Sequence, residues 1–175
     1  FSLDEANRGV DEKWYERELT DQFNLPGSNV ENLKGHDISL TTPFTGSIYD
    51  SSWYFNPYLE KFRRPGNIKV PFWLTQNKYY LGPAWYRKSV SIPSDWKGQQ
   101  IFLILERPHF VSSIYVGNQL AGTQNSLTTA HVYNLTKWMQ AGKVNNLTIR
   151  IDNRLKNMDV GANSHSVTDH TQGNW

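Results

Sequence analysis

The sequence predicts an all-β protein, a β-sandwich with jelly-roll topology and little helix. Three observations favour this fold class. Apolar and polar residues alternate with period two in several segments. Turn residues such as Pro-Gly, Gly-Pro and Gly-Asn recur at short intervals along the chain. Helical patterns are few and brief. Short strands separated by tight turns are typical of a sandwich or jelly roll, here as one domain over residues 1–175.

The expected strands can be placed in chain order. A weak alternation covers residues 13–20, KWYERELT, and β-rich segments follow at 70–76, VPFWLTQ, and 85–93, WYRKSVSIP. The stretch SIYVGNQLAG predicts a hairpin that turns at Gly117-Asn118. The last expected strand, NNLTIRID, carries Leu147, Ile149 and Ile151 on one face.

Only two segments favour helix. Ser94-Asp95-Trp96 predicts a single turn after Pro93. The run LTKWMQAG predicts one or two turns that end at Gly142.

One strand departs from the alternation, because Ile101 to Leu105 are all apolar. A sandwich strand normally has one wet face, so we expect the outer face, with Phe102 and Ile104, to be covered. The cover could be residues 43–68, which are rich in aromatic residues, or a neighbouring domain.

Composition excludes several classes of function. A formal net charge of +2 gives no electrostatic footprint for nucleic acid, and the short basic run KFRRPGNIK is interpreted as a solvated loop. The chain has no cysteine, so disulfides, thiolate catalysis and zinc–thiolate sites are excluded. No apolar run is long enough for a membrane span.

The search for catalytic motifs is negative. Nucleophile-elbow, phosphate-loop, dinucleotide and zinc-helix motifs are absent. His165, Asp169 and His170 lie close in sequence, but hydrogen bonding is the more usual role for such loop residues than metal ligation. Glu106, Arg107 and Asp152 are interpreted as strand-end residues with structural contacts. We therefore expect no catalytic residue, no metal and no cofactor in this chain.

Four stretches, in this order, resemble the sugar-binding jelly-roll domain of glycoside hydrolase family 2, a fold similar to galactose-binding domains. The stretches are FSLD with KWYERELTDQFNLPGS, GPAWYRKSVSIPSDWKGQQIFLILER, SSIYVGNQLAGTQNS and HVYNLTKWMQAGKVNNLTIRIDNR. Two positions depart from the family pattern: Gly117 and Asn118 are in swapped order, and Asn134 replaces the commoner Asp. The family includes β-galactosidases, β-glucuronidases and β-mannosidases.

The resemblance implies a larger enzyme of which this chain is a fragment. In that pattern an immunoglobulin-like domain and a (β/α)₈ barrel follow, and the barrel carries the two catalytic glutamates of a retaining β-glycosidase. The expected partners are therefore a carbohydrate β-glycoside and these downstream domains, with no nucleic acid and no membrane span.

The resemblance also implies which residues face the sugar. One candidate is Asn77, at the end of Thr75-Gln76-Asn77. The others lie in the closing stretch HSVTDHTQGNW, where Asp169, Gln172 and Asn174 offer hydrogen bonds. Trp175 or Trp85 offers a flat face for stacking.

Two alternatives stay open at this point. The domain could be purely structural, at an interface with the barrel or with another subunit, or it could be a free-standing carbohydrate-binding module. The expected location is periplasmic or extracellular in a bacterium, because the absence of cysteine fits an exported protein. The sugar itself is not predicted, since specificity in this family lies mainly in the barrel.

Overall fold

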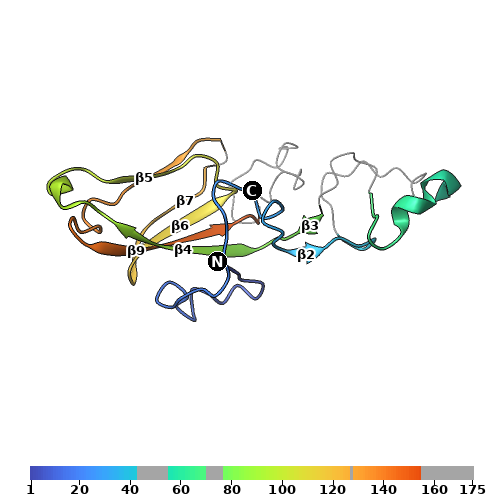
Figure 1. The fold of residues 1–175 in the computed structure, drawn as a ribbon, viewed down its shortest axis with the longest axis horizontal. Coiled ribbons are helices and arrows are strands. Elements are labelled where there is room, and N and C mark those ends of the chain that lie inside the picture. The colour runs from blue at the N-terminus through green and yellow to red at the C-terminus, as the bar shows by residue number, and fades with distance from the viewer. Residues whose placement is uncertain (43–54, 70–76, 127, 155–175) are drawn as a thin grey trace. The chain divides into compact units, whose positions relative to one another are not determined.

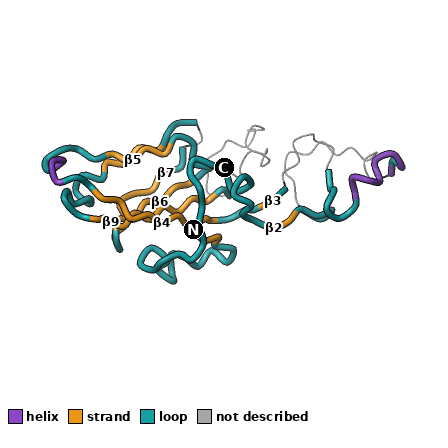
Figure 2. The backbone as a smooth tube through the Cα atoms, viewed as in Figure 1, coloured by secondary structure: helices purple, strands orange, loops and turns teal. Residues whose placement is uncertain are grey.

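The computed structural model describes residues 1–42, 55–69, 77–126 and 128–154. The chain divides into two compact units. One comprises residues 1–24 and 81–158, and the other comprises residues 25–80 and 159–175. Figures 1 and 2 show that the described residues are mostly strand and loop. Among them, no helix is long and apolar enough to cross a bilayer.

The first unit holds a β-sandwich. Its larger sheet has the order β1-β4-β9-β6-β7, with the strands β1 Ser2–Leu3, β4 Pro83–Ser91, β9 Val144–Asp152, β6 Val111–Val116 and β7 Gln119–Gln124. The smaller sheet pairs β5, Phe102–Leu105, with β8, His131–Asn134. All of the strand pairs are antiparallel. The all-β sandwich predicted from the sequence is confirmed.

The core lies between these two sheets. Ile114 of β6 and Leu147 of β9 belong to one buried cluster with Tyr133 of β8, and Leu103 and Leu105 of β5 pack against it. Ile114 is fully buried. Burying a side chain of this size removes enough apolar surface from water to stabilise the fold by about 1.5–3 kcal/mol.

The opposite face of the larger sheet is covered by the N-terminal segment. Tyr15 stacks on Tyr115 of β6 with 4.5 Å between ring centroids, and Trp14 lies 6.3 Å from Trp85 of β4. The segment does this without strand pairing. The prediction of a strand over residues 13–20 is therefore wrong, because aromatic packing on the sheet determines this backbone, which turns and loops.

Local turn chemistry was predicted well. The hairpin β6–β7 turns at Gly117-Asn118, and Gly117 has a φ of 58°, where a side chain would be strained. A single 3₁₀ turn, η2, spans Ser94–Trp96 as expected. Of the one or two helical turns predicted over residues 135–142, a single turn is present, in which the Met139 amide donates to the Leu135 carbonyl at 2.9 Å, and the segment ends at Gly142 with a φ of 76°.

The outer face of β5 is partly exposed among the described residues. Burial alternates along this strand, and Phe102 and Ile104 are 49% and 58% exposed. Val132, opposite Ile104 on β8, is also exposed. Residues 43–54 lie outside the described residues, and residues 43–68 belong to the other unit, so the expected cover, by this segment or by a neighbouring domain, stays a prediction. Five consecutive apolar residues supplied an inner face, and the sequence could not show what lies outside it.

The second unit has little regular structure in its described residues. Two short strands, β2 His36–Asp37 and β3 Lys78–Tyr79, pair antiparallel, and a 3₁₀ helix, η1, spans Pro57–Arg63. The Asn56 side chain caps η1 by accepting a hydrogen bond from the Tyr58 amide at 2.9 Å. The strand predicted at 70–76 lies outside the described residues.

Candidate functional site

The residues predicted to face a sugar are only partly described. Asn77 is exposed and directly precedes β3. The four candidates of the closing stretch lie outside the described residues: Asp169, Gln172, Asn174 and Trp175. Trp85 is fully buried under the N-terminal segment, so its prediction as a stacking surface is wrong.

Each predicted sugar-facing stretch is connected in sequence to a strand of the larger sheet, and we call the two strand ends, Pro83 and Asp152, the roots. The two roots lie side by side at one end of that sheet. Strand β4 begins at Pro83, which pairs with Asp152, the last residue of β9. The chain reaches Pro83 from the side of Asn77, and it leaves Asp152 toward the closing stretch. The Gly82 amide donates a hydrogen bond to Asn153 Oδ1 at 2.7 Å, which ties the two roots together.

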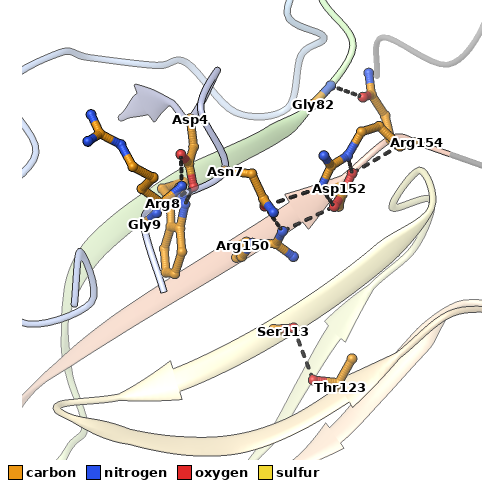
Figure 3. A network of polar contacts seen from close by, with 12 residues as sticks. Asp4, Asn7, Arg8, Gly9, Gly82, Ser113, Thr123, Arg150, Asp152 and Arg154 are labelled. Carbon is orange, nitrogen blue, oxygen red and sulfur yellow. Dashed lines mark hydrogen bonds and ion pairs between the residues drawn. The ribbon is translucent and has the colours of Figure 1, made fainter. Parts of the chain in front are cut away.

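Asp152 is the centre of a polar cluster at this end (Figure 3). Arg154 donates from Nε to Oδ1 at 2.8 Å and from Nη2 to Oδ2 at 2.5 Å, a bidentate pairing. Arg150 Nη2 donates to the same Oδ2 at 3.0 Å. Both guanidinium groups also donate to Asn7 Oδ1, at 2.8 Å from Arg150 and 3.2 Å from Arg154. The cluster therefore joins the N-terminal segment to the last strand.

The charges of this cluster favour an ionised carboxylate. Burial of Asp152 acts to raise its pKa, because it disfavours the charged form. The hydrogen bonds from Arg154 and the positive charges of Arg150 and Arg154 outweigh burial, so the pKa of Asp152 is lowered. Asp152 is thus a permanent anion near neutral pH and is unsuited to donate a proton.

A second buried carboxylate, Asp4, holds the N-terminal loop against β4. Its two oxygens accept hydrogen bonds from the backbone amides of Arg8 and Gly9, each at 2.8 Å. Trp85 Nε1 donates to Asp4 Oδ2 at 3.0 Å. Figure 3 shows Asp4 and Asp152 beside separate groups of donors. Both carboxylates are engaged in structure, as expected for Asp152 from its place at a strand end.

A buried Ser–His pair was not predicted from the sequence. Ser112 Oγ and His131 Nδ1 are 2.5 Å apart, and Ser112 Oγ lies 2.7 Å from the Tyr133 hydroxyl. His131 Nε2 contacts the Ser126 carbonyl at 3.0 Å. Ser112 and His131 are both fully buried, so no substrate reaches the pair. It joins β6 to β8 across the sandwich. Within the described residues, no three His, Asp or Glu side chains are grouped to hold a metal ion.

Part of the Asp152 cluster is recognisable in the sequence. Arg150, Asp152 and Arg154 are two residues apart, the spacing that places side chains on one face of a strand. A carboxylate between two arginines in this register predicts ion pairing. The contribution of Asn7 could not be predicted, because it lies far away in the sequence.

These features define a jelly-roll β-sandwich in which the buried carboxylates Asp4 and Asp152 serve the architecture. The chain belongs to the sugar-binding domain family of the family 2 glycosyl hydrolases, whose family model matches residues 1–172. It is similar to a β-glucuronidase of Formosa agariphila, with 23% identity over 78 residues, which is 45% of this chain and 8% of that protein.

Solved structures share the fold. A β-glucuronidase from Ruminococcus gnavus matches 91% of this chain and 21% of its own chain, with 14% identity and a TM-score of 0.57. Another crystal structure of R. gnavus β-glucuronidase matches 86% of this chain and 19% of its own, with 13% identity and a TM-score of 0.56. The chain thus spans about a fifth of these structures and less than a tenth of the F. agariphila protein.

Proposed function

We propose that this domain works within a larger retaining β-glycosidase, where it shapes the sugar subsite and braces the catalytic barrel. Bond cleavage belongs to two carboxylates outside this chain, in a (β/α)₈ domain joined through an immunoglobulin-like domain. The names of the relatives make aryl β-glucuronides the first substrates to assay, followed by other aryl β-glycosides.

One observation carries the proposal. The stretch that begins at Asn77 runs into β4 at Pro83, and the stretch that runs to Asp169 begins at the end of β9, at Asp152. Pro83 and Asp152 pair with each other. The Gly82–Asn153 hydrogen bond and the Asp152 cluster hold these roots in place. Side chains that contact a substrate need such rigid support, because small misplacements reduce catalysis strongly.

The chemistry of the candidates suits a sugar. Asp169, Gln172 and Asn174 supply carboxylate and amide groups, which can pair with the donors and acceptors of sugar hydroxyls. Trp175 supplies an aromatic face for the apolar side of a pyranose ring. Asn77 adds an amide from the other stretch.

The test is Asp169→Ala in the full-length enzyme, with Asp159→Ala as the matched control. Asp159 lies in the same closing part of the chain but outside the predicted sugar contacts. We expect kcat/KM on an aryl β-glucuronide to fall about tenfold or more, which corresponds to about 1.4 kcal/mol, while the Tm stays near wild type. If Asp169→Ala lowers only the Tm and leaves the kinetics intact, the closing stretch is scaffold.

A second candidate function is that of an interface domain. The open apolar face of β5 and β8, with Phe102, Ile104 and Val132, favours it because such a face gains stability when another surface covers it. The two functions can coexist in one enzyme. A free-standing carbohydrate module is the third candidate. The chain would then bind simple glycosides tightly when separated from any barrel, whereas we expect millimolar affinity or weaker.

We also propose a periplasmic or extracellular location. The support is the lack of cysteine in a chain of 175 residues, together with the carbohydrate context of the family. Fractionation of the source cells tests it, and recovery of the full-length enzyme in the cytoplasmic fraction alone would contradict it.

A further inference from the structure

The segment around η1 has a burial pattern with period three. Asn56, Leu59 and Phe62 are partly buried, whereas the residues between them, which include Tyr58 and Lys61, are exposed. A 3₁₀ helix has three residues per turn, so Tyr58 and Lys61, one turn apart within η1, share its outer row. Phe55 and Arg64 lie just outside the helix, where the backbone of Asn56 and of Arg64 is extended, and both side chains are also exposed. The segment therefore exposes two rings and then two cations in chain order, and these four residues form the row.

The two rings are unusually open to solvent. Phe55 is 81% exposed and Tyr58 is 87% exposed, more than any other large apolar residue in the described part of the chain. Exposure of a single apolar side chain is ordinary, but two aromatic rings only three residues apart in sequence, each with nearly all of its surface in water, indicate a binding surface.

The charge of this segment is also distinctive. Residues 55–69 contain four basic residues and one acidic residue, so their net charge is +3. The whole chain carries +2, which means that all other residues together sum to −1. The single acid, Glu60, pairs with Arg64 at 2.9 Å, whereas Lys61 lies 4.9 Å from the centroid of the Phe62 ring. The excess positive charge of the protein is concentrated here.

We propose that the row of Phe55, Tyr58, Lys61 and Arg64 binds an acidic polysaccharide, a chain of uronic acid residues. Each turn of a 3₁₀ helix rises about 6 Å, which is on the scale of one sugar unit in a chain. Aromatic rings stack on the apolar faces of pyranose rings, and the ammonium and guanidinium groups pair with the carboxylates that every uronic acid unit carries.

The alternatives fit this surface less well. A membrane-binding element needs a continuous apolar face that enters the lipid, and the row has only two rings followed by charged groups. A double-stranded nucleic acid needs a longer basic track than these cations provide. A neutral sugar carries no anionic group with which the excess positive charge of residues 55–69 could pair. The choice of a carbohydrate over other polyanions rests on the family of the chain, whereas the surface itself does not depend on the proposed function.

The experiment measures binding of polygalacturonate to the 175-residue chain by isothermal titration. One variant removes the rings, Phe55→Ala with Tyr58→Ala, and another removes the charges, Lys61→Gln with Arg64→Gln. The matched control is Trp96→Ala with Lys97→Gln, at the other short 3₁₀ turn, where both residues are exposed. We expect each variant of the row to bind about tenfold more weakly or worse, and the control to bind like wild type.

Two further measurements make the result specific. Methyl-esterified polygalacturonate keeps the pyranose rings of the polymer but loses its carboxylate charges, so it should bind at least about tenfold more weakly. Added salt should weaken the complex with the unesterified polymer, because it screens the charges. The proposal is overturned if the row variants bind like wild type, if the esterified polymer binds equally well, or if the chain binds anionic vesicles or DNA but not polygalacturonate. Full-length enzyme with the row variants should keep its kcat/KM on small aryl glycosides, which separates this test from that of Asp169.

Discussion

At the residue scale, Asp152 shows how one carboxylate links distant parts of the chain. Its partners are Arg150, in the same strand, and Arg154, two residues after that strand ends. Both arginines also donate to Asn7 of the N-terminal segment. The Asp152 side chain is fully buried, whereas the side chains of Arg150 and Arg154 keep 12% and 20% of their surface exposed. Removing the carboxylate would take away the anion that both of these largely buried cations share.

We therefore predict that Asp152→Asn destabilises the chain by about 3 kcal/mol. Because the folded pKa of Asp152 is lowered, its contribution is present above the unfolded pKa of about 3.9 and is lost as the pH falls through the folded pKa. Urea denaturation between about pH 3 and 7 measures both effects. The exposed Asp95→Asn is the control, and equal stability of the two variants at neutral pH would contradict the prediction.

The N-terminal loop approaches Trp85 and Asp4 closely at Gly9. A Cβ atom on Gly9 would lie 2.5 Å from Trp85 Nε1 and 2.6 Å from Asp4 Oδ2, so Gly9→Ala forces the Asp4–Trp85 hydrogen bond to open. At Gly122 the nearest atoms, of the Tyr133 ring, are 3.3 Å away, which needs only a small shift.

We expect Gly9→Ala to cost about 1–3 kcal/mol and Gly122→Ala clearly less. Thermal denaturation of the two variants measures the difference. If Gly9→Ala is as stable as wild type, the close approach of the N-terminal loop to Trp85 is wrong.

Trp85 also shows a limit of prediction at this scale. A tryptophan that packs in a core and one that stacks on a sugar have the same apolar ring and the same N–H donor. The partner of that donor decides between the two roles, and here it is Asp4, far away in the sequence. No local pattern around Trp85 contains this information.

At the scale of elements, local signals predicted what local physics determines. The Gly-Asn turn and the strand β9 are both present, as backbone sterics and the apolar pattern predict. Burial alternates only over the first four residues of β9, because Thr148 on the opposite face is also fully buried. The strand prediction for residues 13–20 failed because the aromatic residues of this segment pack on Tyr115 and Trp85, and this packing outweighs the weak alternation. For β5 the apolar run predicted an inner face but could not show which surface covers Phe102 and Ile104, which are exposed among the described residues.

Strands β5 and β6 allow a matched prediction. Ile114→Ala removes a fully buried side chain of β6, whereas Ile104→Ala removes one that is 58% exposed on β5. We expect a loss of about 2–5 kcal/mol for Ile114→Ala and below about 1 kcal/mol for Ile104→Ala, measured by denaturant titration. A large loss for Ile104→Ala in the 175-residue chain would mean that the outer face of β5 is packed after all.

At the scale of the whole molecule, we predict that the 175-residue chain alone has no glycosidase activity. The buried carboxylates Asp4 and Asp152 are each occupied by structural donors. Release of nitrophenol from aryl β-glycosides measures this, with the full-length enzyme as the positive control. Turnover by the chain that disappears when one of its own carboxylates is mutated would contradict the prediction.

The family and the fold could be predicted from the sequence because ordered motifs run along nearly the whole chain. The candidate site could be predicted only in part. Asn77 is described and exposed, but the other sugar-facing candidates lie in residues 155–175, outside the described residues. The polar cluster of Asn7, Arg150 and Asp152 could not be predicted in full, because Asn7 and Arg150 are 143 residues apart in sequence.

The position of β9 has a consequence for synthesis on the ribosome. This strand is the last of the larger sheet in chain order, yet it lies in the middle, between β4 and β6 (Figure 1). A nascent chain that ends before Val144 therefore holds two separate strand pairs, β1 with β4 and β6 with β7. In each pair, the strand that will contact β9 still has unpaired backbone N–H and C=O groups along one edge. Such edges recruit other strands, so the emerging domain depends on chaperones, or on rapid translation, until its final strand leaves the exit tunnel.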